Sequence, residues 1–427
     1  MPNRTYNVYN LLTAPYKRRI RKRVEGLGMT DQAGPLEGLM AIELGTLMAG
    51  PFCGQLLGDL GAEVIKIEPP GQGDPMRAWG QAKADGRPLG FSLIARNKHC
   101  ATLDLRKPEG QEALKALVAK ADFLLENFRP GTLERWGLGY DVLSAINPRL
   151  IMIRVSGYGQ TGPNAKKAGY ASVGEAFGGL RYVMGEPDRR PSRAGISIGD
   201  SLAATFACLG ALAALEARHR TGRGQIVDSA IYEAVLTMME SLIPEYQLAG
   251  YIRERSGSII NNVAPSNIYD TSDGMMIIAA NQNTVFRRLT ELMGQPELAD
   301  DPRFSEHHAR GARQVELDAL VNAWSKTHTS AELQALCDGA AVPCGPLYRA
   351  PEMLQDPHYK AREAIVSVPH SHFGSIMMQN VAPKLSATPG KVRWAAHELG
   401  EDNDYVWLER AGLTRERYDA LKEAGVI

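Results

Sequence analysis

The sequence predicts an α/β fold, in which a large Rossmann-like parallel-sheet domain is joined by long linkers to a smaller α+β domain. Short apolar segments alternate with helical segments through the first half of the chain, as in βαβ units. Beyond residue 262 the composition shifts to short strands followed by helices. The chain has 427 residues, enough for two or three domains with a sizeable core.

Six segments carry the parallel sheet in this prediction. The expected strands cover 39–44, 61–68, 102–105, 121–128, 150–155 and 226–228. The expected helices pass through 55–57 and cover 108–120, 202–218 and 231–248. In the smaller domain we expect strands at 268–269 and 275–280 and helices over 285–293 and 314–327. A charged helical tail follows over 399–427.

These elements give the following domain boundaries. We expect a flexible extension over 1–35, the large domain over 36–230, a linker helix and linker over 231–262, and the small domain over 263–345. Residues 346–427 are a return linker and C-terminal helices that pack on the large domain. The basic run 17–23 within the extension is also compatible with a transit peptide, but a flexible extension is the favoured interpretation.

Composition excludes several classes of function. Lys+Arg and Asp+Glu both number 48, so no net field attracts nucleic acid or an anionic membrane. The five cysteines are scattered without a CxxC pair, which fits a reducing cytoplasm and predicts no metal site. No apolar run approaches the ~20 residues of a membrane span. We therefore expect a soluble cytoplasmic protein without nucleic-acid, membrane or metal partners.

Asp200 stands at a predicted strand-to-helix corner, Gly199-Asp200-Ser201, ahead of an Ala- and Leu-rich helix. Two interpretations are open. Its carboxylate could cap the helix by accepting backbone N–H bonds. A carboxylate beside a helix N-terminus also stays ionised at neutral pH and can serve as a covalent nucleophile. The local sequence does not choose between them.

Polar and aromatic residues lie where two of the predicted strands end. Asn127, Phe128 and Arg129 lie at the carboxyl end of one strand, and Ser156 and Tyr158 at that of another. Ligands of open α/β sheets collect at the carboxyl ends of strands. The first βα turn lacks a GxGxxG fingerprint, so we do not expect a nicotinamide cofactor.

Several segments resemble, in order and spacing, the family III CoA-transferases (CaiB/BaiF type), which include formyl-CoA transferase and carnitine CoA-transferase. They are Ala49-Gly50-Pro51, Gly61 to Pro69, Gly73-Asp74, Leu103-Asp104-Leu105, Glu126 to Gly131, Ser156 to Pro163, Thr221 to Gln225 and Pro343 to Pro346. The resemblance runs from about Leu36 to the C-terminus.

The resemblance implies a covalent mechanism. In this family the nucleophile is the aspartate of a Gly-Asp pair, which Gly199-Asp200 matches. Its carboxylate attacks the acyl-CoA thioester to give a mixed anhydride, and CoA thiolate then forms an aspartyl-CoA thioester. The acceptor acid repeats the cycle in reverse. The resemblance also implies an interlocked homodimer.

The family's coenzyme A contacts carry over residue by residue. Leu103 and Arg106 would lie near the nucleotide, Asn127 and Phe128 would contact CoA, Arg135 would bind its phosphates, and Tyr170 would line its arm. For Leu103 and Phe128, core packing is an equally good interpretation.

The sequence also departs from the family pattern. Ala171, Pro69 and Met48 replace an acidic residue, an arginine and a glutamine of other members, which argues against formyl/oxalate exchange. The motifs are nearer to members that act on succinyl-CoA and C4–C5 dicarboxylates. Arg181, Arg189, Arg190 and Arg193 could bind such an acid or simply form a surface loop. Two alternatives remain, an acyl-CoA racemase and a non-catalytic CoA-binding subunit of a heteromeric transferase.

Overall fold

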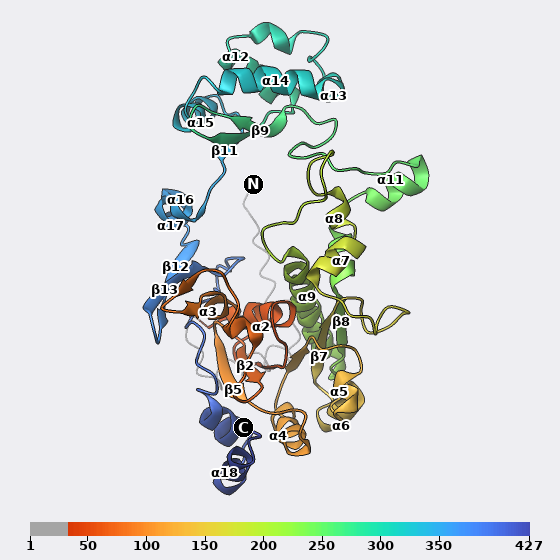
Figure 1. Ribbon diagram of the computed structural model, residues 1–427, viewed down its shortest axis with the longest axis vertical. Coiled ribbons are helices and arrows are strands. Elements are labelled where there is room, and N and C mark those ends of the chain that lie inside the picture. The colour runs from red at the N-terminus through yellow and green to blue at the C-terminus, as the bar shows by residue number, and fades with distance from the viewer. Residues whose placement is uncertain (1–32) are drawn as a thin grey trace, which may run out of the picture. The chain divides into compact units, whose positions relative to one another are not determined.

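The computed structural model describes residues 33–427, which form two compact units (Figure 1). The larger unit holds the described residues up to Gly178 together with Ser197–Met238 and Glu363–Ile427. The smaller unit holds Gly179–Ile196 and Met239–Arg362. The prediction for residues 1–32 lies outside the described residues. Residues 33–35 do not belong to a flexible extension, because Ala33 is buried and a Cβ on Gly34 would lie 2.5 Å from the Leu60 carbonyl oxygen.

A six-stranded parallel sheet organises the larger unit, in the order β5-β2-β1-β6-β7-β8. Its strands are β1 (Met40–Glu43), β2 (Glu63–Glu68), β5 (Lys98–Thr102), β6 (Phe123–Glu126), β7 (Ile151–Ser156) and β8 (Ile226–Ala230). The chain builds outward from β1 to β2 and β5, then returns to the other side of β1. The strand order therefore reverses between β1 and β6, where open α/β sheets bind ligands.

Helices cover both faces of this sheet. They are α2 (Ala49–Asp59), α3 (Gly90–Ile94), α4 (Pro108–Val118), α5 (Thr132–Arg135), α6 (Tyr140–Ile146), α7 (Ala171–Phe177), α9 (Ile198–Thr221) and α10 (Ile231–Thr237). Figure 1 shows α2 and α9 side by side, and both contact the strands. On the opposite face, α4, α5 and α6 share a core with the C-terminal elements. Strands buried on both faces explain the nearly continuous apolar runs of β1, β6 and β7.

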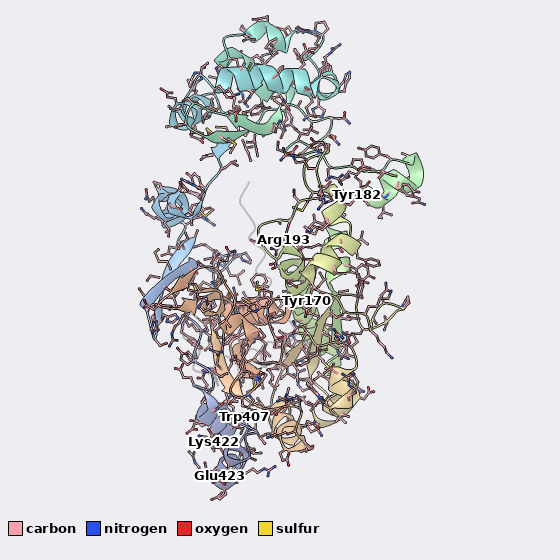
Figure 2. All side chains as sticks on the ribbon, viewed as in Figure 1. Tyr170, Tyr182, Arg193, Trp407, Lys422 and Glu423 are labelled. Atoms are coloured by element: carbon pink, nitrogen blue, oxygen red, sulfur yellow. The ribbon has the colours of Figure 1, made fainter. Side chains whose placement is uncertain are left out.

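The C-terminal segment covers the edge strand β5. This segment contains the π-helical turn η4 (Tyr405–Arg410) and α18 (Arg415–Glu423). The backbone amide of Cys100 donates to Asp402 (2.7 Å), and that of Thr102 donates to Asn403 (2.7 Å). Trp407, within η4, is fully buried (Figure 2). These contacts cover one edge of the sheet. They thereby prevent β5 from pairing with other chains, as an uncovered edge strand can.

Short elements complete the larger unit. They are the 3₁₀ helix η2 (Pro75–Arg77) and two antiparallel pairs, β3 (Lys83–Ala84) with β4 (Arg87–Pro88) and β12 (Ile365–His370) with β13 (Gly374–Gln379).

The smaller unit packs helices on a three-stranded antiparallel sheet of order β11-β10-β9. Its strands are β9 (Ser266–Asp270), β10 (Met275–Ala279) and β11 (Cys344–Pro346). Its helical elements are α8 (Leu180–Val183), α11 (Leu242–Ala249), α12 (Asn283–Leu292), η3 (Pro296–Ala299), α13 (His307–Ala312), α14 (Gln314–Ser325), α15 (Ser330–Gly339), α16 (Ala350–Gln355) and α17 (Pro357–Ala361). Tyr269, Phe286 and Phe304 lie in its own core.

Several predicted boundaries were wrong. The segment 231–248 is two helices rather than one, with Glu240 at φ 52° between them. Pro244 explains the break: it lacks an N–H, so it fits the first turn of α11 but not the interior of a longer helix. The strand expected at 102–105 is β5, which runs from Lys98 to Thr102. The charged side chain of the buried Lys98 interrupts the apolar pattern that would have indicated this strand. The smaller unit also includes 179–196, whereas the sequence predicts these residues within the large domain.

Helix α9 begins at Ile198 rather than at 202 and runs to Thr221. Among the described residues it is long and apolar enough to cross a membrane, although the sequence analysis predicts no run of that length. It lies against α2, β7 and β8 within the larger unit, and this packing accounts for the apolar residues on its buried side.

Candidate active site

A pocket lies at the carboxyl end of the parallel sheet, beside the point where the strand order reverses. Its wall comes from the segments that follow β1, β6 and β7, from the loop before α7, and from the first residues of α9 and α10. The lining residues are Thr46 to Ala49, Asn127 to Pro130, Val155 to Gly157, Ala165, Lys167 to Tyr170, Asp200 and Ile231. Its volume is about 210 Å³. Pockets for drug-sized ligands typically hold ~300–1,000 Å³, so a larger ligand would place only one end here.

Asp200 lies in the first turn of α9 and lines this pocket, half-buried. It is the one carboxylate among the lining residues of the described chain. The residue before the helix is Ser197, so Asp200 is not the N-cap and that interpretation was wrong. A carboxylate in the first turn is favoured in its ionised form by the helix dipole.

The neighbours of Gly199 fix where Asp200 lies. The Gly199 N–H donates to Oε1 of Glu175 in α7 at 3.2 Å. A Cβ on Gly199 would lie 2.9 Å from Cγ of Glu175 and 3.1 Å from Cγ2 of Ile231. Three helices therefore meet at this glycine, and a larger residue would move Asp200 away from the pocket wall.

Asn127 lies in the pocket wall directly after β6, as the sequence predicted. Its Nδ2 donates to the Thr46 carbonyl oxygen (2.8 Å), and its Oδ1 accepts from the Thr46 N–H (2.9 Å). Both ends of the amide thus hold the segment that follows β1. A CoA contact for Asn127 stays a prediction, and the structure adds a positioning contact that sequence reasoning missed.

Phe128 is only partly buried, and it lines the pocket while packing edge-on against Trp136 at 5.4 Å. Its N–H donates to Oε2 of Glu126 (2.7 Å), whose Oε1 accepts from Arg154 (2.7 Å). Burial raises the pKa of Glu126 to about 7, although Arg154 opposes the shift. Phe128 therefore packs on the core and also faces the pocket, and its contact with CoA stays a prediction.

Tyr170 lines the pocket at the start of α7 with 69 % of its surface exposed (Figure 2). The loop before it approaches β7 closely, because a Cβ on Gly157 would lie 3.0 Å from the Gly169 Cα. Glycines at both positions let this loop close over the end of the strand.

The structure does not bring the other three predicted contact residues into this pocket. Leu103, which directly follows β5 in the chain, is buried in the core. The side chain of Arg106 is 74 % exposed and pairs with Asp104 at 2.8 Å. Arg135 is exposed and donates to Oγ1 of Thr132 at 3.0 Å. Contacts of these residues with the distal part of a long ligand stay predictions.

Sequence reasoning placed Arg129 at the end of its strand but missed the cation of Lys167 and one backbone segment of the wall. Arg129 and Lys167 are exposed lining residues. Residues Thr46 to Ala49 contribute the turn after β1 and the first residue of α2. The first turns of α2 and α9 thus both face the pocket, and helix N-termini favour negative charge. The arginines at 181, 189, 190 and 193 belong to the smaller unit, and their suggested role stays a prediction.

Fold and pocket together define a Rossmann-type α/β protein whose site combines one carboxylate, two cations and two helix N-termini. A family model for CoA-transferase family III matches residues 36–403, and the chain belongs to this family. It is a CoA-transferase.

Similar proteins agree with this assignment. The chain is 58 % identical over 394 residues to a succinyl-CoA–D-citramalate CoA-transferase of Chloroflexus aurantiacus, covering 92 % of this chain and 98 % of that protein. It is 41 % identical to the beta subunit of a succinyl-CoA–L-malate CoA-transferase of the same species, covering 92 % and 98 %. A CAIB/BAIF family structure from Brucella suis superposes with a TM-score of 0.80 at 34 % identity, covering 89 % of this chain and 100 % of that one.

Proposed function

We propose that this chain transfers CoA from succinyl-CoA to a C4–C5 dicarboxylic acid of the citramalate or malate type, with Asp200 as the nucleophile. The placement of Asp200 carries the mechanism, because it is the one carboxylate among the described residues that line the pocket. The 58 % identity to the D-citramalate enzyme supports the choice of substrates.

The first half-reaction moves CoA onto the protein. The Asp200 carboxylate attacks the thioester carbonyl, the C–S bond breaks, and CoA thiolate leaves a mixed anhydride of Asp200 and the acyl group. The thiolate then attacks the Asp200 carbonyl carbon and expels the donor acid, which leaves an aspartyl-CoA thioester. No net proton is transferred, and the energy of the thioester is retained.

The second half-reaction is the reverse with a different acid. The acceptor carboxylate attacks the aspartyl thioester and expels CoA thiolate, and the thiolate then attacks the acyl carbon of the acceptor. This step releases the Asp200 carboxylate and the new acyl-CoA. Each tetrahedral intermediate carries an oxyanion, which the N-terminal turns of α2 and α9 would stabilise. Arg129 and Lys167 are candidates for binding the second carboxylate of the acid.

We further propose an interlocked homodimer. The chain passes between its two units at Gly178, Ile196, Met238 and Arg362, so the connections that an interlocked dimer requires are present. Large apolar side chains are exposed in both units. They include Leu209 on α9, Met238 after α10, and Ile243, Tyr246 and Leu248 on α11. A second copy of the chain would bury them.

A transfer assay with the purified chain alone tests this function. Incubation with succinyl-CoA and D-citramalate, L-malate or glutarate should yield the corresponding acyl-CoA by liquid chromatography and mass spectrometry, whereas a C4 monocarboxylate should react poorly. Asp200→Ala should lower turnover by about 10⁴-fold or more. The helix-dipole part of the stability cost of this change should be about 0.5 kcal/mol, because Asp200 lies in the first turn of α9.

The same assay separates the alternatives. A heteromeric transferase would be inactive as this chain alone and would need a second subunit. A racemase would exchange the α-hydrogen of a branched acyl-CoA for deuterium in heavy water without transferring CoA. Either result would contradict the proposed function.

A further inference from the structure

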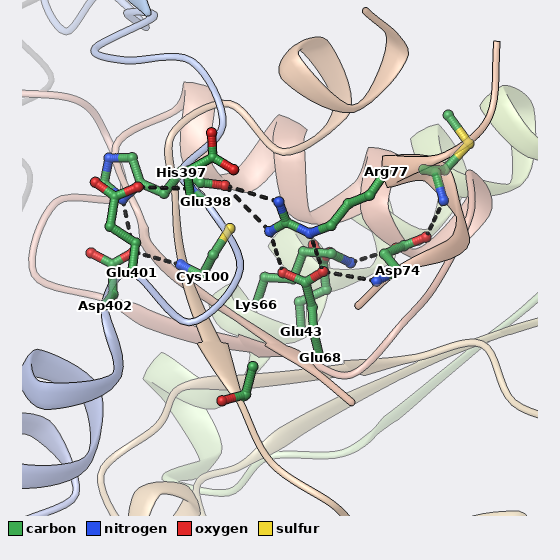
Figure 3. A network of polar contacts seen from close by, with 12 residues as sticks. Glu43, Lys66, Glu68, Asp74, Arg77, Cys100, His397, Glu398, Glu401 and Asp402 are labelled. Atoms are coloured by element: carbon green, nitrogen blue, oxygen red, sulfur yellow. Dashed lines mark hydrogen bonds and ion pairs between the residues drawn. The ribbon is translucent and has the colours of Figure 1, made fainter. Parts of the chain in front are cut away.

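A cluster of buried charged side chains lies next to the turn after β1, which lines the pocket. None of these side chains takes part directly in the proposed transfer reaction. Glu43, Lys66, Asp74 and Lys98 all have fully buried side chains. Lys66 Nζ pairs with Glu43 (3.0 Å) and Asp74 (2.8 Å), while Lys98 Nζ pairs with the other oxygen of Glu43 (2.7 Å). Figure 3 shows Lys66 between the carboxylates of Glu43 and Asp74. Although burial disfavours a charged amine, these carboxylates hold the pKa of Lys66 above its usual value.

The cluster connects to the turn that follows β1. Gly45, Thr46 and Leu47 are each held by a side chain from another part of the unit. Lys66 donates to the Gly45 carbonyl oxygen at 2.9 Å. Asn127 holds both backbone polar groups of Thr46, and Asp74 accepts from the Leu47 N–H at 3.1 and 3.2 Å.

Leu47 adopts a backbone conformation that its side chain disfavours. Its φ is 66°, in the left-handed region that a residue such as leucine rarely enters. Such a conformation is energetically unfavourable and persists only where surrounding contacts hold the backbone in place. Thr46, Leu47 and Met48 all line the pocket that contains Asp200. The strain therefore lies in the pocket wall itself.

Stability alone does not account for this arrangement. Several fully buried charges carry a large desolvation penalty, and apolar replacements of buried ion pairs are often neutral or stabilising. One further hydrogen bond and one close approach link the cluster to the start of α2. Lys98 donates to the Pro51 carbonyl oxygen in the first turn of α2 (2.7 Å), and a Cβ on Gly54 would lie 1.8 Å from Oε2 of Glu43. The charges therefore fix both the turn and the start of α2.

We propose that Asp74, supported by Lys66, is a positioning residue of the active site, which holds the strained turn at Leu47 so that residues Thr46 to Ala49 face Asp200 productively. This inference rests on the proposed function of Asp200. Neither Asp74 nor Lys66 lines the pocket, so both act through the turn.

Asp74→Ala removes the acceptor for the Leu47 N–H. We expect the rate of hydroxylamine-trappable adduct formation on Asp200, measured in a single turnover, to fall about 100-fold, as for a misplacement of about 1 Å. CoA binding should change by no more than a few fold. If Asp74→Ala alone fails to fold, the double variant Lys66→Met/Asp74→Ala replaces it. This variant leaves Glu43 paired with Lys98 and therefore no unpaired buried charge. We expect it to show the same loss in the trapping rate.

Asp59→Ala is the matched control. Asp59 is equally buried in the same unit and pairs with Arg96 (2.6 Å), but neither residue lines the pocket. It should lower the melting temperature comparably while leaving the trapping rate within a few fold of wild type.

Leu47→Gly provides the positive test. Glycine adopts φ near 66° without strain, so the turn would no longer depend on Asp74. In the Leu47→Gly background, Asp74→Ala should therefore cost much less than 100-fold, a coupling that a double-mutant cycle measures. Equal losses in both backgrounds, a wild-type rate for Asp74→Ala, or an equal loss for Asp59→Ala would each overturn the proposal.

Amide hydrogen exchange separates this inference from the function on which it rests. The Leu47 N–H should be protected in the wild type and lose protection in Asp74→Ala. If the wild type forms no adduct on Asp200, the assignment of Asp200 as nucleophile fails. Even then, loss of Leu47 protection together with slower overall transfer in Asp74→Ala would uphold the positioning role. Unchanged protection would contradict it.

Discussion

At the residue scale, the glycine before Asp200 is as constrained as the aspartate itself. Gly199 donates to Glu175 and lies against Ile231, and a Cβ there would lie only 2.9 Å from Cγ of Glu175 and 3.1 Å from Cγ2 of Ile231. A Gly-Asp pair therefore has a steric explanation at this position. The glycine allows α7, α9 and α10 to meet, and their meeting fixes where the carboxylate lies.

Gly199→Ala tests this packing. The added methyl group must displace Glu175 or Ile231, so we expect unfolding to become easier by about 1–3 kcal/mol and transfer to fall with it. Gly195→Ala is the control, because no atom lies within 4 Å of a Cβ at that position. Chemical denaturation should show a change within about 0.5 kcal/mol for the control. Equal stability of the two variants would contradict the steric account.

The residue scale also shows what sequence could predict. The resemblance selected Asp200, Asn127, Phe128 and Tyr170, which the structure places in one pocket. It did not indicate that the Asn127 amide is bound to Thr46, because that contact joins residues 81 positions apart. Lys167 was also missed, since a lysine in a loop with no motif of its own carries no local signal.

At the scale of elements, β5 depends on the C-terminal segment. Both oxygens of Asp402 are bound by histidines, with Nδ1 of His99 at 2.9 Å and Nδ1 of His397 at 2.7 Å. The His397 ring also stacks on Trp394, with centroids 5.6 Å apart. The hydrogen bond to Asp402, opposed by partial burial, raises the pKa of His397 above its usual 6.5. The segment is thus attached to β5 partly through a titratable group.

This attachment predicts a pH dependence of stability. A raised pKa in the folded state means that the contribution of His397 is complete below about pH 6.5 and is lost as the pH rises through the folded pKa. Because the ring is partly exposed, we expect less than about 1 kcal/mol. His397→Asn keeps an N–H donor without titrating. Melting temperatures of wild type and variant should therefore converge or cross above pH 6.5, and parallel curves at all pH values would contradict the assignment.

Elements were easiest to predict where both faces of a strand are apolar. The positions of β1, β2, β6 and β7 follow directly from their apolar runs. The position of β5 did not, because Lys98 and His99 interrupt the apolar pattern. Lys98 is buried there only because Glu43, distant in sequence, neutralises it, a compensation that no local pattern reveals.

At the scale of the whole molecule, the two units have separate cores and the chain passes between them four times, at Gly178, Ile196, Met238 and Arg362. Sequence predicted two domains but not that 179–196 joins the smaller one. This excursion leaves the larger unit after α7 and returns just before Ser197, the residue that precedes α9. A shift in composition cannot reveal a segment as short as 179–196 that leaves one unit and returns to it.

The homodimer proposal makes a prediction at this scale. Because interlocked chains cannot separate without unfolding, the protein should remain a dimer on dilution, and its dissociation should coincide with global unfolding. Light scattering with on-line chromatography from micromolar to nanomolar concentration checks this. A monomer at any concentration that retains native circular dichroism would contradict it.

The central claim is that CoA becomes bound to Asp200 during transfer. The most direct measurement is to incubate the wild-type chain with succinyl-CoA and no acceptor, add hydroxylamine, and identify the modified peptide by mass spectrometry. We predict an aspartyl hydroxamate within the peptide that contains Gly199-Asp200-Ser201, and none in Asp200→Ala. Modification of Glu175, the neighbouring carboxylate that contacts Gly199, or an unmodified chain that still transfers CoA, would contradict the account.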